Sequence, residues 1–316
     1  MSAAPAALAD RARAGDRGAL ARLLSLIEAG GPGAVEALAH LYPHTGGAWT
    51  IGVTGAPGAG KSTLTDRLIA RIRRDGASVG VLAVDPSSPF SGGAILGDRV
   101  RMQGHATDPD VFIRSMASRG HLGGLATATP QAVRVLDAVG IPWVIIETVG
   151  VGQVEVEVAG AADTTVVVVN PGWGDAVQTQ KAGLLEVADV LVVNKADRAG
   201  RDETVQDLHR MLALGADRDW TPPVVETVAT EGRGIDELWA AVGVHRAHLE
   251  SGDRLAAKRA GRTRDELRAL VREQLGQRAA AVCDGPAFDA LVARVMDRAL
   301  DPYEAVTSLL ESPDTR

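Results

Sequence analysis

One short stretch constrains the fold of this chain more than any other. Residues 55–62 read Gly-Ala-Pro-Gly-Ala-Gly-Lys-Ser and match the pattern G-x-x-x-x-G-K-[ST] in full. An apolar β-type run, Trp49–Thr54, precedes the stretch, and a helical run, Leu64–Ile72, follows it. In a strand–loop–helix unit of this kind, the loop amides and the helix N-terminus point at phosphate oxygens. The stretch therefore predicts a phosphate-binding loop, or P-loop, within an α/β fold.

The residues of this loop have expected contacts with a nucleotide. Lys61 is expected to neutralise charge on the β and γ phosphates, and Ser62 to offer its hydroxyl to Mg²⁺. The alternative is a Gly-rich turn without a ligand, which is disfavoured because the strand and the helix are both in place. The candidate nucleotide ligands in this stretch are Gly55, Ala56, Pro57, Gly58, Ala59, Gly60, Lys61, Ser62 and Thr63.

Further apolar runs alternate with helical patterns along the chain. Several of them are continuous Val, Ile and Leu stretches, which are typical of strands buried on both faces of a parallel sheet. We therefore expect a mostly parallel, doubly wound sheet whose ligand groups lie at the carboxyl ends of the strands. Besides the first strand, the runs are Val79–Val84, Val111–Ser115, Trp143–Glu147, Thr164–Asn170, Val190–Asn194 and Val224–Val228.

Three zones are expected along the chain. Residues 1–46 form an N-terminal helical extension, in which apolar side chains recur at spacings of three or four between Leu20 and Ile27. Residues 47–250 form the P-loop domain that carries the sheet. Residues 251–316 form a charged C-terminal helical arm, a kind of segment that usually serves as a packing or dimerisation surface.

The composition of the chain argues against some classes of binding partner and some cellular locations. The chain has 33 Lys and Arg against 40 Asp and Glu, which argues against binding to nucleic acid or to an anionic membrane. A single cysteine, Cys283, excludes an internal disulfide framework, and its Ala-rich surroundings suggest a packing role. No apolar run is long enough to span a bilayer. The N-terminal region has no cleavage-site pattern, which argues against a signal peptide. It is Arg-rich like a mitochondrial transit peptide, but such peptides are poor in acids and this region carries several, so we expect a cytoplasmic protein.

A second motif indicates the base of the nucleotide. Asn194-Lys195-Ala196-Asp197 follows the apolar run Val190–Val193, and N-K-x-D after a buried strand reads guanine. The carboxylate of Asp197 can accept hydrogen bonds from the guanine N1–H and 2-amino groups, which adenine does not offer. The backbone of Val228 and Ala229 is a further candidate contact with the guanine carbonyl. Together with the P-loop, this motif predicts a protein that binds GTP and GDP and hydrolyses GTP.

Three acids are candidates for a magnesium site. Asp85 and Glu147 end predicted strands, and Asp98 follows a loop rich in Ser, Gly and Pro. Oxygen ligands of this kind, together with the Ser62 hydroxyl and waters, are the ligands that Mg²⁺ prefers. Each acid alone could be a solvated loop residue, but their placement at strand ends and in switch-like loops favours a metal site.

At this point the residues resemble a known family. The whole chain looks like a MeaB/ArgK-type GTPase, a G-protein chaperone of adenosylcobalamin-dependent acyl-CoA mutases such as methylmalonyl-CoA mutase. The segment 85–102 is far more specific to that family than a P-loop is. The stretches that carry the resemblance, besides the two motifs, are Leu41–Gly46, Val84–Pro89, Gly92–Met102, Arg119–Gly124, Glu147–Gln153 and Leu300–Tyr303.

The resemblance implies an assembly and a set of moving parts. Members of the family gate cofactor loading and protect the mutase from inactivation, and the resemblance implies a homodimer that uses the C-terminal arm. Three switch regions are implied, near residues 85–102, 147–158 and 172–183. By motif position, Arg101 and Lys181 match residues that link the switches to the nucleotide state and to the mutase.

The same resemblance assigns roles to the acids and marks one departure. Asp85, Asp98 and Glu147 match the family's Mg²⁺ and hydrolysis acids, which makes them catalytic candidates with Lys61, Arg101 and Lys181. In the third switch, many members of the family have the sequence G-D-E-L-Q-G-I-K. This chain departs from that sequence at Ala176, Val177, Thr179 and Gln180. This loop would meet the partner, so the identity of the mutase stays open.

Other functions compete with this interpretation. A nickel or zinc metallochaperone GTPase shares the architecture, but such proteins need thiolate or imidazole ligands, and here the cysteine is alone and the seven histidines are scattered. A non-catalytic regulatory subunit, in which GTP only holds a dimer together, would be excluded by GTP turnover. A kinase acting on a transport protein is disfavoured because N-K-x-D selects guanine over adenine.

Overall fold

A computed structural model describes residues 4–86, 103–105, 107–118, 124–148, 160–172, 186–214 and 219–311. The chain divides into two compact units, Met1–Arg262 and Thr263–Arg316. The strands are β1 (Trp49–Gly55), β2 (Val79–Pro86), β3 (Val111–Ser118), β4 (Trp143–Thr148), β5 (Thr164–Val169), β6 (Val190–Asn194) and β7 (Val224–Thr227). The helices of the first unit are α1 (Pro5–Arg13), α2 (Arg17–Ala29), α3 (Pro32–Leu41), α4 (Lys61–Arg74), α5 (Gly124–Ala138), α8 (Arg201–Leu214) and α9 (Ile235–Glu250), followed by the start of α10 (Arg254–Cys283).

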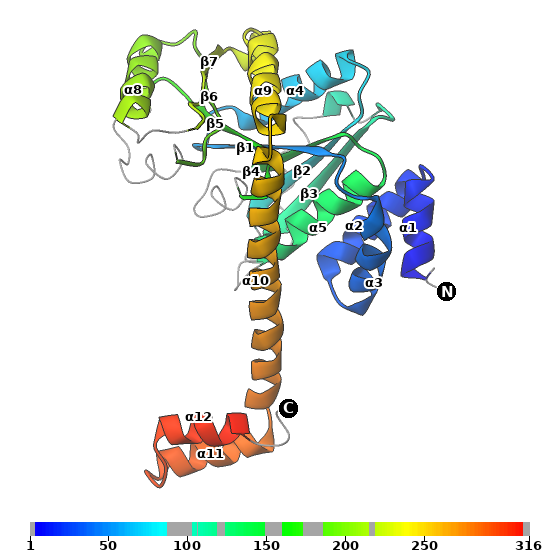
Figure 1. Ribbon diagram of the computed structural model, residues 1–316, viewed down its shortest axis with the longest axis vertical. Helices are drawn as coiled ribbons and strands as arrows, with labels where there is room; N and C mark the ends of the chain where they lie inside the picture. Colours follow the sequence, from blue (N-terminus) through cyan, green and yellow to red (C-terminus); the bar gives the residue numbers. More distant parts are fainter. Residues whose placement is uncertain are drawn as a thin grey trace. The chain divides into compact units, whose positions relative to one another are not determined.

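The strands form one seven-stranded parallel sheet in the order β3-β2-β4-β1-β5-β6-β7 (Figure 1). Each strand lies within one of the apolar runs, or extends it slightly, which confirms the predicted parallel, doubly wound sheet. Strand β1 lies in the middle, where the strand order turns from one side of the sheet to the other. In open α/β sheets this switch point is where ligands bind, beyond the carboxyl ends of the strands.

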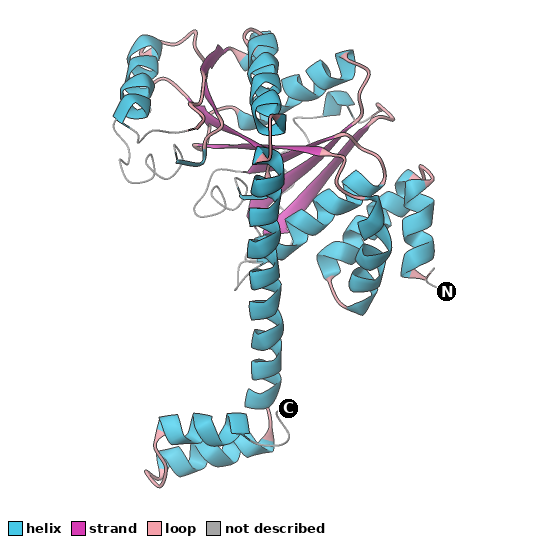
Figure 2. Cartoon of the chain, in the orientation of Figure 1, coloured by secondary structure: helices cyan, strands magenta, loops and turns pink. Residues whose placement is uncertain are grey.

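Helices cover both faces of the sheet, as Figure 2 shows. On β5, Val166 and Val168 belong to a cluster of strand residues that α4 and α9 cover, whereas Val167 and Val169 pack with Leu208 of α8. Successive side chains of a strand point to opposite faces, so a strand covered on both faces is apolar at every position. This burial explains why β5 reads as an uninterrupted run of Val and Thr.

The N-terminal helices pack against the sheet through α5. Buried side chains of α1, α2 and α3 share a hydrophobic cluster with α5 and with strand residues. Asp16 caps α2 by accepting a hydrogen bond from the Ala19 amide at 2.9 Å. Arg114 of β3 forms an ion pair with Glu28 of α2, and Arg17 donates to the Val111 carbonyl at 2.7 Å. These helices therefore contribute to the same core as the sheet.

The first turns of α10 are fixed to the amino ends of β1 and β5. Asp163, only 1% exposed, accepts hydrogen bonds from the Thr50 amide at 3.0 Å and from Arg259 Nη2 at 2.9 Å, and it pairs with Arg262. Burial by itself would raise the pKa of Asp163, but the Arg259 hydrogen bond and the charges of Arg262 and Arg259 outweigh it, so its pKa is lowered. Lys258 adds a bond to the Asp163 carbonyl at 2.8 Å.

The second unit contains the rest of α10 with α11 (Pro286–Met296) and α12 (Pro302–Glu311). Along α10, Leu267, Val271 and Leu275 recur every four residues and are 57, 56 and 57% exposed. Cys283 is exposed, so the packing role suggested by its sequence surroundings is wrong. No helix in the described part of the chain combines the length and the apolarity that a membrane span requires.

Candidate nucleotide-binding site

Glycines shape the loop that follows β1. Gly55 has φ +135°, and a Cβ at this position would lie 2.0 Å from the Val168 carbonyl oxygen of β5. Gly60 has φ +95°, and a Cβ there would lie 2.4 Å from Asn194 Nδ2. A side chain at either position would therefore collide with a neighbouring strand end, and positive φ disfavours one as well. The loop is thus pressed against β5 on one side and against the N-K-x-D segment on the other.

Lys61 and Ser62 begin α4 directly after this loop, and both side chains are buried. The Lys61 ammonium donates to the Gly55 carbonyl at 2.7 Å and to the Ala56 carbonyl at 3.0 Å. It is therefore held against the first two residues of the loop. Positive charge from Lys61 and the N-terminal end of the α4 dipole lie together, an arrangement suited to phosphate.

Candidate metal ligands lie on β4, which pairs with β1, and on β2, the next strand beyond β4 in the sheet. Glu147, 2% exposed, stands opposite Val53 of β1 and Ala83 of β2 in the strand register. The next residue, Thr148, donates a hydrogen bond to Thr54 Oγ1 at 3.2 Å. The backbone of Asp85 lies at the carboxyl end of β2. The structure thus brings Glu147, the Asp85 backbone and the P-loop to the same edge of the sheet.

Three predicted catalytic residues, Asp98, Arg101 and Lys181, lie outside the described residues. The same holds for most of the three predicted switch regions, including the four residues that depart from the family pattern. His105, one of the seven scattered histidines, lies after the first of these regions. Its Nε2 is 3.2 Å from Asp66 Oδ1 of α4.

Asn194 connects the P-loop to the segment after β7. Its Nδ2 donates to the Ala59 carbonyl at 2.8 Å. Its Oδ1 accepts hydrogen bonds from Thr227 Oγ1 at 3.0 Å and from the Ala229 amide at 3.1 Å. Because all these groups are buried, the side chain is locked in one orientation. The asparagine of the motif therefore acts as a support between the two loops.

The remaining residues of the motif also lie beside the P-loop. Lys195 has φ +59°, a conformation rare for residues other than glycine, and its Nζ donates to the Gly58 carbonyl at 2.6 Å. Asp197 follows with an exposed side chain that is accessible to a base. Val228 and Ala229 are buried, and the Ala229 amide is directed at Asn194.

Sequence reasoning did not identify Arg67 as part of this site, and for the segment that contains Thr227 it predicted only a backbone contact. Arg67 of α4 donates from Nε to the Ala229 carbonyl and from Nη2 to the Thr230 carbonyl, each at 3.0 Å. Thr227 holds Asn194, as described above. Arg67 belongs to no sequence motif, and both side chains have partners far away along the chain, so only the folded structure reveals these contacts.

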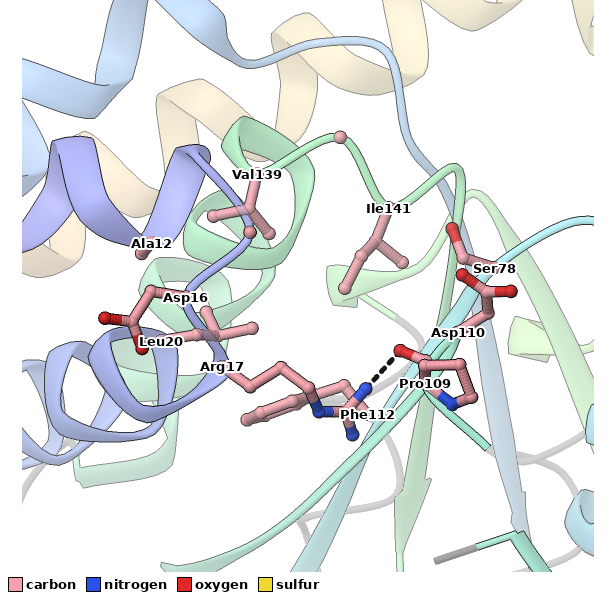
Figure 3. A pocket seen from close by; sticks show the side chains of 12 residues that line it. Ala12, Asp16, Arg17, Leu20, Ser78, Pro109, Asp110, Phe112, Val139 and Ile141 are labelled. Atoms are coloured by element: carbon pink, nitrogen blue, oxygen red, sulfur yellow. Dashed lines mark hydrogen bonds between the residues drawn. The ribbon is translucent and has the colours of Figure 1, made fainter. Parts of the chain in front are cut away.

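A separate pocket of about 210 Å³ lies at the opposite end of the sheet (Figure 3). It is formed between the α1–α2 turn, the start of β3 and the turn from α5 to β4. Arg17 lies on its wall with both described hydrogen bonds directed at backbone carbonyls, those of Pro109 and Val111. This pocket is therefore distinct from the candidate nucleotide-binding site.

Comparisons with known proteins agree with the geometry. Residues 20–284 match the family model described as methylmalonyl Co-A mutase-associated GTPase MeaB. A Pyrococcus abyssi protein is 50% identical over 308 residues, covering 96% of this chain and 95% of that protein. The GTPase ArgK of Escherichia coli is 39% identical, with 84% of this chain and 83% of ArgK covered.

Two further similarities concern a mammalian protein and a solved structure. The mouse protein named methylmalonic aciduria type A homolog, mitochondrial, is 37% identical over 66% of this chain and 52% of its own length. A crystal structure titled LAO/AO transport system kinase has a TM-score of 0.72 and 29% identity, and the match covers 98% of both chains. The likeness to that structure extends over both units of the chain.

Proposed function

The chain belongs to the MeaB family of GTPases, and from that premise we propose that it is the GTP-hydrolysing chaperone of an adenosylcobalamin-dependent acyl-CoA mutase. GTP hydrolysis itself follows from the family and from relatives such as ArgK. The single observation that carries the mutase assignment is the match of residues 20–284 to a family described as associated with methylmalonyl-CoA mutase. Gating of cofactor loading and protection of the mutase are the expected roles.

In the proposed mechanism, hydrolysis depends on positioning and charge neutralisation. The Lys61 ammonium and the first amides of α4 bind the β- and γ-phosphates. Asp197 accepts the hydrogen bonds of the guanine N1–H and 2-amino groups, while Asn194 keeps the base-binding and phosphate-binding loops together. Arg101 is the candidate for stabilising the transition state from within the chain, and Asp98 is a further candidate acid.

We include Mg²⁺ as the cation of this site. The Ser62 hydroxyl and the buried Glu147 carboxylate are hard oxygen donors at the same edge of the sheet, and Asp85 ends the neighbouring strand. A carboxylate buried at a strand end is stabilised by a nearby positive charge, so this donor set fits Mg²⁺. A bound Mg²⁺ would supply neutralisation of phosphate charge. The residues that would hold it are Ser62, Asp85, Asp98 and Glu147.

We also propose that the second unit forms a homodimer surface. The exposed stripe of Leu267, Val271 and Leu275 supports this role, because apolar side chains in a continuous row favour burial against a partner. Lys181 and the third switch region are proposed to face the mutase. The division into an N-terminal extension, a GTPase domain and this arm is part of the same proposal.

The experiment that tests this function is GTP turnover with and without the adenosylcobalamin-dependent acyl-CoA mutase of the same cell. Lys61→Ala serves as the blank for contaminating phosphatases. We expect slow hydrolysis by the protein alone and clear stimulation by the mutase. Hydrolysis that no such mutase stimulates would contradict the chaperone assignment and favour the metallochaperone alternative, whereas no hydrolysis at all would favour a non-catalytic subunit.

A further inference from the structure

Arg67 connects the phosphate-binding helix to the loop beside the base. It lies in the second turn of α4, the helix that begins with Lys61 and Ser62. Its Nε and Nη2 donate to two consecutive carbonyl oxygens, those of Ala229 and Thr230, at 3.0 Å each. Two donors of one planar guanidinium fix both the distance and the orientation of the groups they bind. Arg67 therefore helps to fix the position of this loop relative to α4.

The loop that Arg67 holds is a single 3-10 turn, Ala229–Glu231, directly after β7. On its inner side, Asn194 Oδ1 accepts from the Ala229 amide and from Thr227 Oγ1. On its outer side, the hydrogen bonds from Arg67 hold the carbonyls. A 3-10 turn has few and poorly aligned hydrogen bonds of its own, so these two side chains supply much of its rigidity.

The neighbouring arginines of α4 form ion pairs with aspartates. Arg71 pairs with Asp75, Arg73 with Asp108, and Arg74 with Asp236. The hydrogen bonds of Arg67, in contrast, are directed at neutral carbonyls of the loop. A cation at such a position orients the peptide units it binds, and their N–H groups with them.

We propose that Arg67 is a positioning residue for guanine recognition. It acts through the loop, which it holds in the conformation whose backbone receives the guanine 6-carbonyl, and it keeps that loop at a fixed separation from the phosphate-binding end of α4. The inference rests on the GTPase function and adds a residue that sets nucleotide affinity and base preference without touching the nucleotide.

The test compares GDP with 6-thio-GDP, which keeps the N1–H and 2-amino groups but replaces the 6-oxygen by a weaker acceptor. Affinities and GDP dissociation rates are measured for the wild type, Arg67→Ala, Arg67→Lys and the matched control Arg74→Ala on the same helix. For Arg67→Ala we expect GDP release about ten-fold faster, as for the loss of a charge-assisted hydrogen bond. Arg67→Lys, which keeps one donor position, should fall between the two.

Two further measurements distinguish a positioning role of Arg67 from a general loss of folding stability. The preference for GDP over 6-thio-GDP should fall in Arg67→Ala and stay at the wild-type value in Arg74→Ala. In steady-state hydrolysis, Arg67→Ala should raise KM for GTP while kcat changes by no more than about two-fold, because uniform binding is lost and the catalytic groups are retained. Thermal unfolding of each variant checks that the fold is intact.

Three results would count against the inference or its premise. GDP release from Arg67→Ala at the rate of Arg74→Ala would overturn it. An equal loss of affinity for GDP and 6-thio-GDP would overturn the role in guanine recognition. A wild-type protein that binds no GDP would remove the nucleotide function itself, a failure visible before any variant is made.

Discussion

Asp163 at the amino end of the sheet and Lys61 at the carboxyl end are both buried charged residues, but their surroundings differ. Asp163 is surrounded by Arg259 and Arg262, so its charge is balanced within the chain. The Lys61 ammonium is held by backbone carbonyls of the P-loop, at the edge that we propose binds the nucleotide. From this contrast we predict that the charges at the amino end stabilise the fold, whereas the charge of Lys61 at the carboxyl end acts on a ligand. Substitutions at the two ends should therefore separate stability from activity.

The largest expected effect on stability is that of Asp163→Ala. Removing one partner of a buried ion pair leaves the other charges uncompensated, so the free energy of unfolding should fall by about 3 kcal/mol or more. Chemical denaturation measures the loss. The matched control is Asp219→Ala, because Asp219 pairs with Arg254 of the same helix but is 68% exposed. Equal midpoints for the two variants would refute the structural role of Asp163.

Lys61→Ala should produce the converse result. We expect GTP hydrolysis to fall by about 100-fold or more, because a charge directed at the phosphates is lost. The unfolding midpoint without nucleotide should change far less than in Asp163→Ala. Parallel assays of turnover and unfolding on both variants would show the separation. A Lys61→Ala protein as active as the wild type would disprove the role of the P-loop.

Asp197→Ala tests the base-binding side of the carboxyl end. Guanine loses the acceptor for two hydrogen bonds, so the preference for GTP over ATP should fall by about 100-fold. Competition of each nucleotide against labelled GDP measures this ratio. Asp202→Ala, which removes an exposed acid near the start of α8, should leave the ratio unchanged. A preserved preference in Asp197→Ala would mean that another group selects the base.

Lowering the pH should destabilise the protein through two buried aspartates at the amino end of the sheet, Asp163 and Asp189. The pKa of Asp163 is lowered from its ordinary value of 3.8 in the folded protein, and so is that of Asp189, where the His245 hydrogen bond and Lys258 outweigh burial. The unfolded state therefore takes up these protons first, and this contribution to stability is lost as pH falls below the ordinary value toward the folded-state pKa. Asp163→Asn should show a shallower dependence of unfolding free energy on pH in that range, and an unchanged slope would argue against it.

Local sequence patterns predicted the strands and the loops, but not the contacts between distant segments. The run Val166–Val169 identifies a buried strand by itself, because a strand that is buried on both faces has apolar residues at successive positions. The bond between Asn194 and Ala59 joins residues 135 positions apart, and the motif alone predicts contact with a base rather than with the P-loop. Asp163 and Arg259 were not singled out, since an isolated acid before a strand is ordinarily solvated.

The exposure of Cys283 and the contacts of Arg67 could not be predicted from the sequence. Cys283 sits among alanines in a helical pattern, and composition alone could not show that this part of α10 is exposed in the single chain. Arg67 resembles the other arginines of α4 in sequence, and only its hydrogen bonds to Ala229 and Thr230 distinguish it.

The central claim, that GTP hydrolysis by this protein gates cofactor loading, is tested most directly by loading itself. Adenosylcobalamin binding to the cofactor-free mutase can be followed by the cobalamin absorbance in the presence of this protein and either GTP or a non-hydrolysable GTP analogue. We predict that loading proceeds with GTP and is held back with the analogue, and that Lys61→Ala removes the difference between the two nucleotides. Equal loading with GTP and with the analogue by the wild-type protein would contradict the account.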